Sequence, residues 1–166
     1  MVKLHKAGER FQRDKRVEEK TPFRHTEKYR IGTRCPDCGL VFSGSVWKKP
    51  EPTSGGQFPS KPCPACLLVR DGQIGGIVQL SGNFAALHRR DLMNRIRNVE
   101  KVSSLERPLE RIIKIDETGD EISVAVTTEH LAARIGKAIQ RDYGGELQLK
   151  YAPEEKYAIA RWHRDL

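Results

Sequence analysis

The chain contains four cysteines, and all of them fall into two Cys-x-x-Cys pairs, Cys35/Cys38 and Cys63/Cys66. A tight turn at each pair can present two thiolates to one metal ion, so two pairs complete the tetrahedral ligand set that zinc prefers. Gly39 directly follows the first pair and permits a turn with positive φ. The spacing therefore predicts a zinc ribbon, in which four thiolates hold one structural zinc ion and leave no coordination position open for catalysis.

Two other uses of paired cysteines fit the sequence less well. A thiol-redox site of the Cys-x-x-Cys type needs a strand–helix–strand context, and none surrounds either pair. An iron–sulfur cluster also accepts four cysteines, but two evenly matched pairs favour zinc. The sequence has no run of about 18 apolar residues and no secretory signal, so we expect a cytoplasmic protein, in which disulfides are rare.

The distribution of apolar residues predicts an α+β protein with four parts. Residues 1–30 lack apolar periodicity and mix Lys, Arg and Glu, which predicts a flexible basic tail. Residues 31–82 form the predicted zinc ribbon, which ends in an apolar strand. Residues 83–107 predict a linking helix, and residues 108–166 predict a β-β-α-β-β domain.

Local signals indicate where the predicted elements begin and end. The step Gly75-Gly76 predicts a turn before the last strand of the ribbon, and Asn83 is a candidate N-cap for the linking helix. Gly119 lies in the predicted turn of a hairpin between two alternating strands. Thr128 predicts the cap of the helix that follows, and the glycines after Tyr143 predict its end.

The chain is strongly basic, with a net charge of +8, which favours a polyanionic partner. Such a partner is either nucleic acid or an anionic membrane surface; no apolar segment is long enough to span a bilayer, and we expect nucleic acid and no membrane. Cations beside an aromatic ring, or repeated along one flank of a helix, can contact phosphates and support stacking of unpaired bases. The candidate RNA-binding residues are Arg34, Trp47, Lys48, Lys49, Lys61, Arg70, Arg89, Arg90, Arg134, Lys137 and Arg141.

No set of side chains in the sequence predicts catalysis. The histidines are not spaced near a cysteine or carboxylate as a nucleophile–base pair would be, and neither a P-loop nor a dinucleotide fingerprint occurs. Gly55-Gly56-Gln57 matches the tripeptide with which release factors hydrolyse peptidyl-tRNA, but a match of three residues has little specificity. We expect a non-enzymatic protein without a small-molecule substrate, and keep hydrolysis through Gln57 as an alternative.

The second cysteine pair and the strand after it resemble a known family. The sequence is similar to short bacterial zinc-ribbon proteins and, distantly, to the archaeal and eukaryotic adaptor that binds the large ribosomal subunit during maturation and export. That adaptor has a cysteine knuckle, a Gly-containing turn and an apolar-apolar-Gln-Leu strand, then a Gly-acidic hairpin and a Ser/Thr-led helix with alanines. The matching residues are Cys63, Cys66, Gly75, Gly76, Gln79, Leu80, Gly119, Asp120, Thr128, Ala132 and Ala133.

The resemblance implies the ribosome as the partner and ribosomal RNA as the polyanion, with the large subunit favoured. We therefore expect a ribosome-associated factor that acts in assembly, hibernation or a stress response by occupying a site on the RNA. Two alternatives from other classes stay open. One is a zinc-ribbon regulator that binds DNA, and the other is a protein–protein adaptor that docks through the β-β-α-β-β domain.

Overall fold

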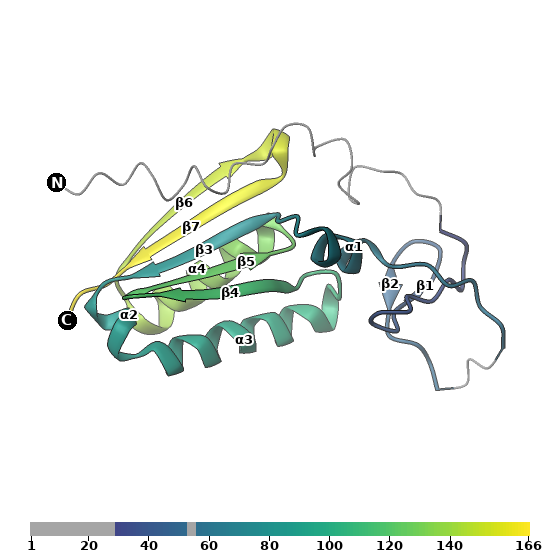
Figure 1. The fold of residues 1–166 in the computed structure, drawn as a ribbon, viewed down its shortest axis with the longest axis horizontal. Coiled ribbons are helices and arrows are strands. Elements are labelled where there is room, and N and C mark those ends of the chain that lie inside the picture. The colour runs from purple at the N-terminus through teal and green to yellow at the C-terminus, as the bar shows by residue number, and fades with distance from the viewer. Residues whose placement is uncertain (1–28, 53–55) are drawn as a thin grey trace.

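The computed structural model describes residues 29–52 and 56–166. In these residues the chain is a mixed α+β protein with four α-helices and two β-sheets (Figure 1), which confirms the predicted class. The predicted basic tail, residues 1–30, lies outside the described residues except for Tyr29 and Arg30. None of the described helices is long and apolar enough to cross a membrane.

A five-stranded sheet forms the larger part of the structure. Its strands are β3 (Gly76–Ser81), β4 (Ile112–Thr118), β5 (Glu121–Val126), β6 (Glu146–Ala152) and β7 (Tyr157–His163). They are ordered β4-β5-β3-β7-β6, and β3 runs parallel to β7 while the other neighbouring pairs are antiparallel. The predicted hairpin around Gly119, which has φ 58°, is the β4–β5 pair, so this local prediction is confirmed.

The helices between these strands share a core with one face of the sheet. α2 (Asn83–Leu87) and α3 (Arg89–Glu106) connect β3 to β4, and α4 (Glu129–Tyr143) connects β5 to β6. α4 packs on β3 and β7, and α3 packs on α4 (Figure 1). The main hydrophobic core therefore lies between this helical layer and the sheet, and it includes buried residues of α3, α4, β3, β5 and β7.

The sequence predicted α4 and both of its ends correctly. Thr128 Oγ1 accepts a hydrogen bond from the Leu131 N–H at 3.1 Å, and Gly144 follows the last helical residue. Leu131, Ile135 and Ile139 recur at helical spacing and are fully buried against the sheet. This helix shows both the local signal of a cap and the periodic signal of an apolar face, which is why its prediction succeeded.

The predicted linking helix of residues 83–107 is present, but it is divided into α2 and α3 at His88. This residue has φ −109° and ψ 24°, and its ring stacks on Phe84 with 4.1 Å between the centroids. Asn83 is the first helical residue, and Gly82 occupies the cap position that we predicted for Asn83. Gly82 has no side chain to bind a helix-terminal N–H, and Asp165 accepts the Asn83 N–H at 3.1 Å instead.

We predicted that the strand now labelled β3 would be the last strand of the zinc ribbon, residues 31–82. In the structure β3 belongs to the five-stranded sheet instead. β3 is the central strand of the five-stranded sheet, between β5 and β7. Ile77, Val78 and Leu80 are all buried. A run of consecutive apolar residues is typical of a strand covered on both faces, and a small ribbon hairpin does not provide that cover.

Of the two glycines for which we predicted a turn, Gly75 lies in a bend directly before β3 and Gly76 is the first residue of β3. A Cβ at Gly75 would lie 2.1 Å from the carbonyl oxygen of Thr127, and a Cβ at Gly76 would lie 2.7 Å from the Cβ of Ala132. The Gly75 N–H donates to the Val126 carbonyl oxygen at 2.8 Å. These glycines therefore allow α4 and the end of β5 to approach β3 closely.

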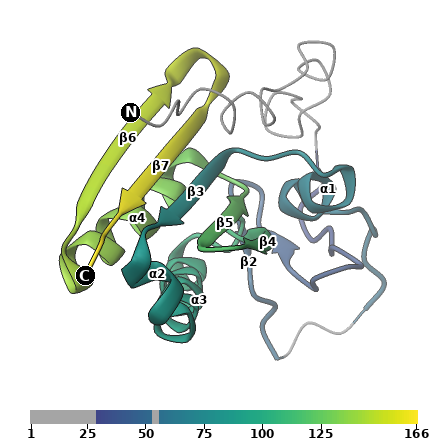
Figure 2. The ribbon, with the colours of Figure 1, turned by 60° about the vertical axis from the view of Figure 1, so that its left-hand side comes forward.

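Residues 29–52 and 56–71 form a small unit at one end of the sheet, which we call the cysteine module (Figure 2). It contains the two-stranded sheet of β1 (Val41–Phe42) and β2 (Trp47–Lys48) and the helix α1 (Pro64–Asp71). The second cysteine pair, for which we predicted a tight turn, lies at the start of α1, because Pro64 suits the first position of a helix and the residues after Cys66 continue it.

Candidate metal centre

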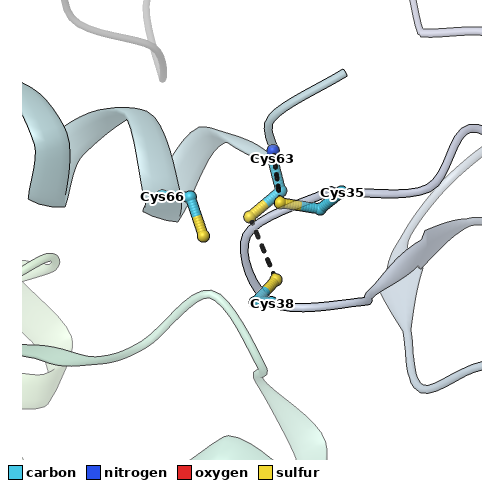
Figure 3. Close-up of side chains that lie close together, drawn as sticks. All are labelled: Cys35, Cys38, Cys63 and Cys66. Atoms are coloured by element: carbon cyan, nitrogen blue, oxygen red, sulfur yellow. Dashed lines mark hydrogen bonds between the residues drawn. The ribbon is translucent and has the colours of Figure 1, made fainter. Parts of the chain in front are cut away.

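The four cysteine side chains of the cysteine module converge on one point (Figure 3). Their Sγ atoms all lie within 4.8 Å of one another, and those of Cys38 and Cys63 are 3.7 Å apart. Four sulfurs about 2.3 Å from a central zinc ion form a tetrahedron with edges of about 3.8 Å. All four cysteines are free thiols. The cluster contains the four predicted ligands and is compatible with a metal site.

Two local structures bring the pairs into position. The first pair lies in a turn in which the Gly39 N–H donates to the Cys35 carbonyl oxygen at 2.9 Å, and the Cys35 N–H donates to Leu40 at 2.8 Å. Gly39 has φ 79°, the conformation predicted for it. Cys63 occupies the N-cap position of α1 without a capping side-chain hydrogen bond, and Cys66 lies in the first turn. The Cys63 N–H donates to Cys35 Sγ at 3.2 Å. A backbone N–H of the second cysteine pair thus donates directly to a sulfur atom of the first cysteine pair.

Burial raises the pKa values of the cysteine thiols, and hydrogen bonds from N–H groups lower them. Burial raises the pKa of Cys35, but N–H groups of Cys63, Cys38 and Asp37 outweigh burial, and this pKa lies at about 7. Burial raises the pKa values of Cys63 and Cys66 above their ordinary range. A metal ion that binds to these sulfurs must therefore displace protons from buried thiols.

Arg111, which directly precedes β4, reaches the cluster from the five-stranded sheet. Its Nη1 donates to Cys66 Sγ at 3.0 Å, and its Nη2 donates to Cys38 Sγ at 3.2 Å and to Cys63 Sγ at 3.8 Å. Burial lowers the pKa of Arg111, but its bonds to Cys38 and Cys66 outweigh burial and raise it. Such N–H···S bonds orient thiolate ligands and offset their negative charge.

Thr127 and the segment before β4 hold Arg111 in place. The Arg111 N–H donates to Thr127 Oγ1 at 2.9 Å, and that hydroxyl donates to the Leu109 carbonyl oxygen at 2.8 Å. Arg111 Nε donates to the Pro108 carbonyl oxygen at 3.0 Å. The sequence analysis did not identify Arg111 or Thr127, because no local pattern relates either residue to the distant cysteine pairs.

Trp47, one of the residues predicted to contact RNA, lies in the core of the cysteine module. It is 6% exposed, and its ring centroid is 4.9 Å from that of Tyr29 and 5.4 Å from that of Phe42. Its ring faces are therefore covered by protein, and we assign it to the core. The neighbouring Lys48 and Lys49, also predicted to contact RNA, are exposed.

Two other predicted cations of the module lie over aromatic rings. Arg34 Cζ is 5.0 Å from the centroid of Phe58, and Lys61 Nζ is 5.0 Å from the centroid of Tyr29. The Lys61 N–H donates to the Arg34 carbonyl oxygen at 3.1 Å, so the two cation–aromatic pairs are adjacent. The sequence analysis did not identify Phe58, which lies in a loop rich in Pro, Gly and Ser.

The remaining predicted RNA-binding residues are spread over the molecule. Four of them form ion pairs, which are Arg70–Asp37, Arg89–Glu117, Arg134–Glu110 and Arg141–Asp142. Arg90 and Lys137 are exposed, and within residues 29–52 and 56–166 neither forms an ion pair. These six residues therefore lie on α1, α3 and α4, and four of them are paired with carboxylates.

A hydrogen-bonded Ser–His–Asp chain, which the sequence analysis missed, lies where β3 and β7 end. Ser81 Oγ is 3.0 Å from His163 Nδ1, and His163 Nε2 is 3.1 Å from Asp165 Oδ2. Ser81 and His163 are register partners in parallel strands. The side chains of His163 and Asp165 are 52% and 61% exposed. Water screens the interaction between two side chains as exposed as these. The carboxylate that orients the histidine of a serine hydrolase is buried, and Asp165 is not.

Gln57, the residue of the hydrolytic alternative, is exposed in the loop between β2 and α1. Gly55, which belongs to the same tripeptide, lies outside the described residues. Hydrolysis through Gln57 stays a prediction from three residues of sequence.

No protein-family model matches this chain, and no curated protein or solved structure is significantly similar to it. The resemblance to the ribosomal adaptor therefore stays a prediction from sequence.

Proposed function

We propose that this protein is a non-enzymatic RNA-binding factor in which one zinc ion stabilises the cysteine module. Its proposed partner is ribosomal RNA of the large subunit. The observation that carries the proposal is the adjacent placement of Arg34 on Phe58 and Lys61 on Tyr29. The protein would act by occupying an RNA site during ribosome assembly, hibernation or a stress response.

The chemistry of the donor set supports zinc as the metal. Four thiolates form a closed set that suits the tetrahedral preference of zinc, and zinc held by four sulfurs has no open position for a substrate. Together the four thiolates and a divalent zinc ion keep a net negative charge, which the guanidinium of Arg111 offsets through its bonds to Cys38 and Cys66. These features favour a structural ion and a non-enzymatic protein.

The cation–aromatic pairs support RNA as the polyanion. An unpaired base can stack on a phenyl ring or on a guanidinium plane, and a neighbouring ammonium can contact its phosphate. Arg34, Phe58 and Lys61 offer these groups side by side on the cysteine module, and Lys48 and Lys49 add positive charge to the same module. Stacking needs accessible base faces, which single-stranded loops provide and double helices do not.

The choice of the ribosome rests on two further arguments. The net charge of +8 favours a highly charged partner. The second cysteine pair and β3 also resemble the adaptor of the large ribosomal subunit. A rigid module placed on an unpaired loop of ribosomal RNA would hold or block that site without any chemical step.

The proposal is tested by RNA binding of the zinc-loaded full chain, measured by fluorescence anisotropy with a uridine RNA of about 16 nucleotides. Base–aromatic stacking contributes about 1–3 kcal/mol, so Phe58→Ala is expected to weaken binding by about 5- to 150-fold. Lys150→Ala removes an exposed cation from the edge strand β6 and serves as the control. We expect it to change the affinity by less than about twofold, because one exposed charge contributes little.

Two comparisons decide between the proposal and its alternatives. Cosedimentation of the wild-type protein, but not of Phe58→Ala, with large ribosomal subunits in moderate salt is the expected result. Equal binding by the two proteins would remove Phe58 from the interface and contradict the proposal. Tighter binding to duplex DNA than to the uridine RNA would favour the DNA-binding alternative.

A further inference from the structure

A groove of about 500 Å³ lies between α3 and α4, apart from the RNA-binding surface proposed on the cysteine module. All of its charged lining residues are cations, and they are Arg95, Arg134, Lys137 and Arg141. Val102 and Ala138 contribute to its apolar lining. The groove thus combines an apolar interior with an exclusively positive set of charges.

Ion pairs within the protein neutralise only part of this charge. Arg95 and Arg141 both contact the carboxylate of Asp142, at 2.5 and 2.9 Å, and Arg134 pairs with a buried glutamate. Neither carboxylate lines the groove. Lys137 is exposed and forms no ion pair within the residues that the structure describes. The four lining cations therefore outnumber the two carboxylates that pair with them.

The apolar surface continues out of the groove along α3. Val102 is 58% exposed, and Leu105, about one turn further along the helix, is 68% exposed. Neighbouring exposed apolar side chains beside a groove are typical of a docking surface for another protein. The phosphate backbone of RNA would pair with the cations and leave these apolar groups uncovered, whereas an amphipathic helix covers both kinds of group.

We propose that this α3–α4 groove binds an acidic amphipathic segment of a partner protein. The apolar side chains of that segment cover the exposed Val102 and Leu105, and its carboxylates pair with Lys137 and Arg141. Charge complementarity selects this occupant. The N-terminal residues 1–28 of this chain are excluded by the same argument, because they contain nine Lys and Arg against five Asp and Glu. The surface is independent of RNA binding and adds a protein partner to the function.

The test is a selection of random peptides of about 16 residues, displayed on phage, against the zinc-loaded full chain. Peptides that bind the charge-reversed double variant Lys137→Glu/Arg141→Glu are discarded. The expected survivors are rich in Asp and Glu and carry Leu, Ile or Phe at positions i, i+3, i+4 and i+7. Anisotropy with one labelled survivor then measures the contribution of each side of the groove.

We expect each of the two variants to weaken peptide binding by at least about tenfold. The double variant loses the charge complementarity to the peptide, and Val102→Asp loses an apolar contact with it. Val102→Asp alters an exposed position, so it keeps the test valid if the double variant unfolds. The matched control is Lys101→Glu, which reverses an exposed charge on α3 outside the groove lining. It is expected to change the affinity by less than about threefold.

Three results would overturn the proposal. The selection could return no acidic amphipathic peptides, or the survivors could bind Val102→Asp as tightly as the wild-type protein. The third result would be that the double variant loses as much affinity for the uridine RNA as it loses for the peptide. That result would assign the groove to RNA. Phe58→Ala is expected to leave peptide binding unchanged, so failure of this proposal is distinguishable from failure of the RNA proposal.

Discussion

The cysteine module and the five-stranded sheet with its helices differ in how each can be stable. Among the described residues, the hydrophobic core of the sheet and helices contains nineteen buried residues, so we expect it to be stable without a ligand. The buried core of the cysteine module contains six residues, and three of them are cysteines. A core of that size is small for an independent fold, so we expect the module to depend on a metal ion bound by its sulfurs.

The protein contains one tryptophan in each of these regions, which makes the comparison measurable. Trp47 is 6% exposed in the cysteine module, and Trp162 is 1% exposed in the core of the sheet. The single-tryptophan variants Trp162→Phe and Trp47→Phe therefore report separately on the module and on the sheet. A buried indole that becomes solvated shifts its fluorescence to longer wavelength, so each region has its own signal.

The largest effect is expected from removal of the metal. Structural zinc contributes about 10–16 kcal/mol of apparent binding free energy in small zinc modules, and that energy is largely folding energy. A strong chelator, or Cys63→Ser, is therefore expected to unfold the cysteine module and expose Trp47, while Trp162 stays buried. Fluorescence of the two single-tryptophan proteins checks this, with metal content measured by elemental analysis. If Trp47 stays buried in metal-free protein, the module does not depend on metal.

Leu131→Ala in α4 is expected to have a smaller effect on stability, confined to the five-stranded sheet and its helices. Leu131 is fully buried in the core of the sheet, and truncation of a buried leucine costs about 2–5 kcal/mol of unfolding free energy. Denaturant unfolding followed through Trp162 measures the loss, and the zinc content is expected to stay unchanged. Leu105→Ala is the control, because Leu105 is 68% exposed. An equal loss in both variants would contradict the assignment of the core.

The contact between the two regions is expected to have an intermediate effect. Arg111→Ala removes the guanidinium that bonds to Cys66 and Cys38, and it leaves those acceptors without their donor at a cost of about 1–3 kcal/mol. We expect zinc to be released faster and the unfolding transitions of Trp47 and Trp162 to separate. Arg107→Ala removes an exposed arginine nearby and is expected to change neither property. Coincident transitions in Arg111→Ala would show that other contacts couple the regions.

The smallest effect is expected from the cap of α4. Thr128→Ala removes the hydroxyl that accepts the Leu131 N–H, and loss of such a cap costs about 1 kcal/mol. Thermal unfolding followed through Trp162 measures the loss, while the Trp47 signal of the zinc-loaded module is expected to stay unchanged. Thr118→Ala, at the exposed end of β4, is the control and is expected to be nearly neutral.

The sequence by itself determined those features that depend on neighbours within a few residues. The spacing of the two cysteine pairs predicted the four clustered sulfurs, and Gly39 predicted the positive φ of the first turn. Gly119 predicted the β4–β5 hairpin, and Thr128 predicted the cap of α4. Each signal is local, because a turn or a cap is satisfied by hydrogen bonds inside a short segment.

Only the tertiary structure decided which distant segments meet. It placed β3 between β5 and β7, buried Trp47 among aromatic rings, and brought Arg111 to sulfurs of residues up to 73 positions away in the chain. It also aligned Ser81 with His163 through the register of two parallel strands. Such contacts depend on the packing free energy of the whole core, and no short stretch of sequence contains that information.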